Sequence, residues 1–74
     1  MDKPKAPLIG ANGNVFNLIG ITGRTLKQNK VDQEIIQEFI DRVYKAQSYD
    51  EALMIMWDYV EPVTLEEMEM THYE

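Results

Sequence analysis

Residue types that perform nucleophilic catalysis are scarce in this sequence. It has no cysteine, its only serine is Ser48 and its only histidine is His72. Nucleophilic catalysis needs an activated nucleophile, a base and a group that orients the base. Ser48 stands where a helix is expected to begin, and His72 lies near the end of the sequence. We therefore expect a protein that is not an enzyme and has no catalytic residue.

One pair of residues has the spacing of a metal half-site. Glu69 and His72 match the Glu-x-x-His motif of di-iron helix bundles. Those sites need two such motifs and two further carboxylates, and the sequence holds one motif. Its four glycines also lack the spacing of phosphate-cradling or dinucleotide-binding loops. We expect no metal ion and no cofactor.

Charge is divided unequally along the 74 residues. Residues 1–30 carry five bases and one acid, whereas residues 31–74 carry two bases and twelve acids. The formal net charge is −6 and the sequence pI is about 4.6. Such a division shapes the long-range field of the molecule and limits its plausible partners.

The acidic half contains the candidate partner-binding surface. Asp58 and Glu61 come at the end of an expected helix, where negative charge opposes the helix dipole. Met54 lies on the polar side of that helix, and methionines are frequent at adaptable interaction surfaces. Either these acids dock a basic partner, which we expect to be another protein, or they only keep a small domain soluble. The predicted partner-binding residues are Asp50, Met54, Asp58, Glu61, Glu66 and Glu67.

Nucleic-acid binding is the alternative function. Arg24, Lys27 and Lys30 form a basic end of an expected helix, and three helices permit a helix-turn-helix arrangement. Against this, the chain is acidic overall, opposite to the basic footprint of most DNA-binding domains. Bases in the last turn of a helix also complement its dipole without any ligand.

Hydrophobic periodicity predicts three helices. The first runs from Leu18 to about Gln28 after an N-cap at Asn17, and the second from about Asp32 to Gln47. The third follows a capping box that starts at Ser48, and a proline ends it at or before Glu61. Two glycines in the first helix indicate close approach of a neighbouring backbone or, alternatively, a moving element.

The chain ends are less regular. We expect residues 1–7 to be flexible and residues 8–62 to form one helical domain. The Asn12-Gly13 pair indicates a small hairpin, with an irregular arm as the alternative. Residues 63–74 are expected to form either a short helix, begun by a capping box at Thr64, or a frayed acidic tail.

The expected fold is therefore mostly α. It is a compact three-helix bundle with a short N-terminal arm or β-hairpin and, at the C-terminus, either a short fourth helix or a frayed tail. No apolar run approaches the length of a membrane span, so we expect a cytoplasmic protein without membrane contact, and we leave a homodimer open. The predicted core is Phe16, Leu18, Ile19, Leu26, Ile36, Phe39, Ile40, Val43, Leu53, Met56, Trp57 and Val60.

Three segments together resemble a known kind of protein. They are residues 7–17, residues 24–27 and residues 48–53, with the sequences PLIGANGNVFN, RTLK and SYDEAL. They resemble small uncharacterised proteins of Gram-positive bacteria, often encoded in mobile or phage-like elements, over roughly residues 7–62. The resemblance implies an accessory or regulatory role in a bacterial cytoplasm, and it implies no site residue.

Overall fold

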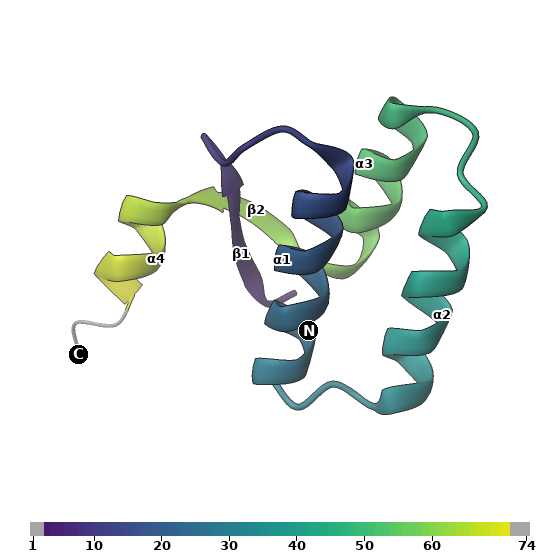
Figure 1. Cartoon of the computed structure of the whole chain (residues 1–74). Helices are drawn as coiled ribbons and strands as arrows, with labels where there is room; N and C mark the ends of the chain where they lie inside the picture. The colour runs from purple at the N-terminus through teal and green to yellow at the C-terminus, as the bar shows by residue number, and fades with distance from the viewer. Residues whose placement is uncertain (1–2, 72–74) are drawn as a thin grey trace.

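The computed structural model describes residues 3–71 and is mostly helical, as predicted. Within those residues, four helices and one short two-stranded sheet are connected by loops (Figure 1). In chain order the elements are β1 (Lys5–Ile9), α1 (Val15–Gln28), α2 (Gln33–Tyr44), α3 (Tyr49–Tyr59), β2 (Glu61–Thr64) and α4 (Leu65–Thr71).

The sheet joins the two ends of the chain. β1 and β2 are parallel, with Lys5 opposite Glu61 and Ile9 opposite Thr64, and the register is irregular between them. Parallel strands need a long crossover, and here the three helices α1 to α3 provide it. The predicted hairpin is therefore wrong, because β1 pairs with a strand far along the chain. Residues 5–7 also lie in a strand, where the sequence favoured a flexible N-terminus.

α1 begins earlier than predicted and ends in a tight cap. Its N-cap is Asn14, whose side-chain oxygen accepts a hydrogen bond from the Phe16 amide at 2.8 Å, instead of Asn17. At the other end Lys30 has a φ of 59°. The Lys30 amide donates to the Lys27 carbonyl and the Val31 amide to the Leu26 carbonyl, the pattern of a Schellman motif.

Both predicted capping boxes are confirmed. The Ser48 hydroxyl accepts from the Glu51 amide at 3.0 Å, and the Glu51 carboxylate accepts from the Gln47 amide at 3.1 Å. At the start of α4, Thr64 and Glu67 bond each other's amides reciprocally. These local bonds explain why α3 and α4 begin where the sequence predicts. α2, in contrast, ends at residue 44, three residues before its predicted end.

The core lies between the helices and the sheet. Phe39 and Met56 are fully buried at its centre, and the Phe39 ring meets the Tyr59 ring edge-on with centroids 5.3 Å apart. Seven predicted core residues are confirmed as buried: Leu18, Leu26, Ile36, Phe39, Val43, Met56 and Val60. Three more pack against the core while partly exposed: Ile19, Ile40 and Leu53.

Two predicted core residues are not buried. Phe16 is 65% exposed and Trp57 is 44% exposed. Residues of the sheet, among them Ala6 and Val63, contribute to the core instead. α3 also buries the face that carries Ile55 and Met56, so Trp57 lies on the neighbouring, exposed side of the helix.

The difference in burial predicts a difference in stability. Phe39→Ala should lower the free energy of unfolding by about 3–5 kcal/mol, because it removes a fully buried ring. Trp57→Ala should lower it by less than half as much, since nearly half of that side chain already faces solvent. Urea denaturation of both variants checks this. Equal losses, or a larger loss for Trp57→Ala, would contradict the description of the core.

Candidate interaction surfaces

An apolar groove lies between α1 and α2. It encloses about 440 Å³, and its lining includes Ile19 from α1 and Ile36, Phe39 and Ile40 from α2. Phe39 and Ile36 are buried core residues, so the groove reaches down to the core itself. An apolar hollow of this kind is the usual setting for a ligand or a partner side chain.

Two glycines, Gly20 and Gly23, leave the α1 side of this groove without side chains at their positions. At Gly20 and at Gly23, an added Cβ would meet no heavy atom within 4 Å. The prediction that these glycines allow close approach of a neighbouring backbone is therefore wrong for the described chain. Each glycine weakens the helix by about 1 kcal/mol relative to alanine, and among residues 3–71 nothing fills the space beside either glycine.

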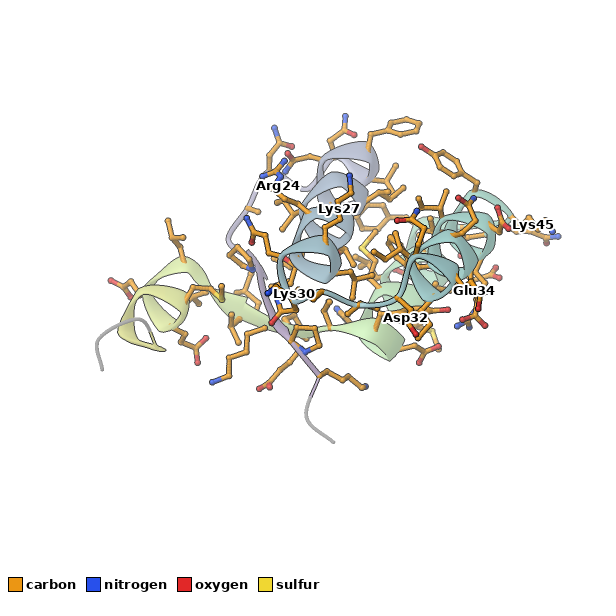
Figure 2. The ribbon with its side chains drawn as sticks, turned by 90° about the horizontal axis from the view of Figure 1, so that it is seen from below. Arg24, Lys27, Lys30, Asp32, Glu34 and Lys45 are labelled. Carbon is orange, nitrogen blue, oxygen red and sulfur yellow. The ribbon has the colours of Figure 1, made fainter. Side chains whose placement is uncertain are left out.

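Basic side chains border the groove on the α1 side. Arg24 and Lys27 line it and are exposed, and α1 contains no acidic residue. Lys30 follows just beyond the end of the helix. Figure 2 shows Arg24 and Lys27 on α1 and Lys30 past its end, with Asp32 before α2 and Glu34 on the side of α2 away from α1. The structure thus brings the three predicted nucleic-acid-binding residues to the α1 side of the groove.

The apolar surface continues past the end of the groove. A second hollow of about 340 Å³, between the start of α1, the end of α2 and the start of α3, shares Ile19 and Tyr44 with the first. Phe16 and Tyr44 border it and are 65% and 63% exposed. We call the two hollows together the α1–α2 groove.

A separate hollow of about 700 Å³ lies over the exposed side of α3. Met54, Trp57 and Asp58 line it from α3, and Arg42 of α2 and Lys3, which precedes β1, also line it. Met54 is 63% exposed, and the Lys3 ammonium donates to the Trp57 carbonyl oxygen at 2.8 Å. We call this area the α3 surface.

Asp58 has a partner on the α3 surface. The Arg42 guanidinium forms an ion pair with Asp58 at 3.1 Å and donates to the Tyr59 hydroxyl at 3.1 Å. The hydrogen bond to Tyr59 is the largest cause that raises the pKa of Arg42 above its usual value, and the hydrogen bond to Asp58 is the next. The acid that opposes the dipole of α3 is therefore balanced by a base from α2. With Lys3 and Lys45 also present, the α3 surface carries both signs of charge.

The other predicted acids lie on different elements. Glu61 lies in β2 opposite Lys5, and Glu67 takes part in the capping box of α4. α4 packs against the two strands. The six predicted partner-binding residues thus lie on three elements: Asp50, Met54 and Asp58 on α3, Glu61 on β2, and Glu66 and Glu67 on α4.

The remaining predictions concern a metal site and a membrane span. The side chains of Glu69 and His72 fall outside the described part of the structure. Within residues 3–71, no three His, Cys, Asp or Glu side chains are grouped so that they could hold a metal ion. In the same range, each helix is too short or too polar to cross a membrane.

Comparison with known proteins identifies no relative. No protein-family model matches the chain, and neither a curated protein nor a solved structure is significantly similar to it. The geometry of the surfaces is therefore the basis for any functional proposal.

The groove was not predicted, although the sequence contains a signal for it. Gly20 and Gly23 lie one turn apart on the helix that carries Arg24 and Lys27 and no acid. Such glycines on an amphipathic helix can mark an open face as well as a packed one. Aromatic residues at the edges, Phe16 among them, fitted the core pattern and gave no sign of exposure.

The open glycines predict a gain in stability. Gly20→Ala and Gly23→Ala should each raise the free energy of unfolding by up to about 1 kcal/mol, because alanine favours the helix and its methyl group meets nothing. Urea denaturation measures both changes. A loss of stability in either variant would show that the space beside that glycine is filled in solution.

Proposed function

We propose that the protein is a non-enzymatic interaction module whose α1–α2 groove binds an acidic amphipathic helix of a partner protein. The observation that carries this proposal is the open space above Gly20 and Gly23 beside an apolar floor. In keeping with the resemblance of residues 7–62, we propose an accessory or regulatory role in a bacterial cytoplasm.

The shape of the groove favours a helix as the ligand. Helix-in-groove recognition places apolar side chains, spaced three and four residues apart, into a hydrophobic groove. Ile36, Phe39 and Ile40 supply such a surface, and the missing side chains of the two glycines allow a helix backbone to approach α1 closely. Glycine lowers the stability of α1 relative to alanine. A bound helix would fill the space that the missing side chains leave.

The charge of the rim favours an acidic ligand. Arg24 and Lys27 border the groove, and no acid lies on α1 to neutralise them. Complementary charge at the rim of an interface speeds encounter and suppresses partners of the wrong sign. A nucleic acid also carries negative charge, but its phosphates would make no use of the apolar floor.

A peptide-binding experiment tests the proposal. The probe is a fluorescent synthetic helix of about 18 residues, long enough to be helical alone, with leucines on one face and glutamates beside them. Wild-type protein should bind it. Gly23→Leu should weaken binding at least about tenfold, or about 1.4 kcal/mol, by filling the groove. Fluorescence anisotropy gives the dissociation constants.

A matched control separates a blocked groove from a changed surface. Gln28→Leu places the same side chain at an exposed position of α1 outside the lining of the groove, and it should bind the peptide as wild type does. The same peptide with lysines in place of glutamates should bind weakly. Equal binding by Gly23→Leu and wild type would overturn the proposal. Displacement of the peptide by a single-stranded oligonucleotide at low salt would favour nucleic-acid binding instead.

The α3 surface supports a second candidate function, docking of a basic partner protein. Trp57 and Met54 are exposed there beside Asp58, and tryptophan is enriched among the residues that contribute most to binding. Asp50 lies at the start of the same helix. Because Arg42 already pairs with Asp58, the apolar side chains and not the acids are the expected anchors.

Substitution at this surface distinguishes the two candidates. If the α3 surface docks the partner, Met54→Ser with Trp57→Ser should reduce recovery of a partner at least about tenfold in a quantitative pull-down. Gln28→Leu should leave recovery unchanged. Full recovery by the double variant, with loss in Gly23→Leu, would assign the partner to the α1–α2 groove and remove the second candidate.

A further inference from the structure

We infer that the acidic helix bound in the α1–α2 groove is α4 of a second copy of this chain. The inference rests on the proposed binding function of the groove and names its partner. Two copies would each insert α4 into the groove of the other, which gives a symmetric dimer. Charge, exposed apolar surface and the place of α4 in the fold all favour this arrangement.

The two elements have opposite and unmixed charge. α1, from Val15 to Gln28, has bases and no acid, whereas α4, from Leu65 to Thr71, has acids and no base. Glu66 is exposed and makes no ion pair among residues 3–71. The uneven charge along the chain thus makes one end of the molecule complementary to the other end of a second molecule.

α4 also carries apolar surface that its own chain leaves uncovered. Leu65 is 61% exposed in the first turn of the helix. Its side chain and the glutamates beside it are the features that the groove is expected to select. Leu65 of a second copy would pack over Gly20 and Gly23, where the groove is apolar. Glu66 would then lie beside Lys27 at its basic rim.

The fold prevents α4 from filling the groove of its own chain. α4 packs against β1 and β2, and in Figure 1 it lies on the far side of the sheet from α2. To reach its own groove it would have to leave the strands. A second copy needs no such change. Pairing of two grooves face to face is disfavoured, because Arg24 and Lys27 of both copies would meet.

Symmetry gives the arrangement enough contact to form a weak dimer. A helix of seven residues buries little surface alone, but a two-fold axis repeats the contact. We expect the total buried area to fall near the low end of specific interfaces, which bury about 1,200–2,000 Å². We therefore expect a dimer whose population rises over protein concentrations from about 1 µM to 1 mM.

Sedimentation equilibrium across that range tests the inference. Wild type and the control Gln28→Leu should show a monomer–dimer equilibrium. Gly23→Leu and Glu66→Lys should each shift the dissociation constant upward at least about tenfold. Lys27→Glu should do the same, while Lys27→Glu combined with Glu66→Lys should restore association, because the two charges are reversed together. Thermal melts show whether each variant is folded.

The outcomes separate this inference from the proposed function. A wild type that stays monomeric to 1 mM, yet binds the acidic peptide in a manner blocked by Gly23→Leu, overturns the second-copy inference and leaves the function standing. A dimer that Gly23→Leu and Glu66→Lys leave unchanged overturns it as well, because its interface lies elsewhere. Restored association in the charge-reversed double variant supports the inference, since a purely structural effect of either substitution would not be rescued.

Discussion

Pairing of β1 with β2 is the constraint on which the rest of the structure depends. The two strands lie at opposite ends of the chain, and the three helices between them form the crossover that parallel pairing requires. Ala6 of β1 is buried in one cluster with side chains of α1 to α3, and Val63 of β2 is buried where β2 contacts β1 and α4. A chain of this length without cysteine has a small core, so these residues contribute a meaningful part of it. The pairing also holds α4 against the strands and away from α2.

The sheet covers one side of the helices and leaves another side open. Ala6, Leu8 and Val63 are buried in the core, while Phe16 stays exposed and the α1–α2 groove stays uncovered. Gly20 and Gly23 then keep that groove deep at the expense of helix stability. Sites that bind partners are commonly less stable than they could be. On this account the weak points of α1 are the features that make it a binding surface.

Local features of the fold could be predicted from the sequence, and features formed by distant segments could not. Capping at Ser48 and Thr64 depends on residues three apart, so the starts of α3 and α4 were predicted correctly. The parallel strands depend on contacts between the two ends of the chain, for which the Asn12-Gly13 pair gave a misleading local signal. Asp58 lacked an explanation in the sequence because its partner, Arg42, lies on another helix. Hydrophobic periodicity predicted that Trp57 is buried. The buried face of α3 in fact carries Ile55 and Met56 and is rotated by about one residue from the predicted face.

The central claim is that the α1–α2 groove is a binding surface for an acidic helix. Amide chemical shifts of the two groove glycines, Gly20 and Gly23, test it most directly, because these nuclei lie at the open wall itself. When the acidic peptide is added to isotopically labelled protein, both glycine signals should move, while those of Gly10 and Gly13 should stay in place. Movement of the Trp57 indole signal with unchanged Gly20 and Gly23 signals would contradict the account and move the binding site to the α3 surface.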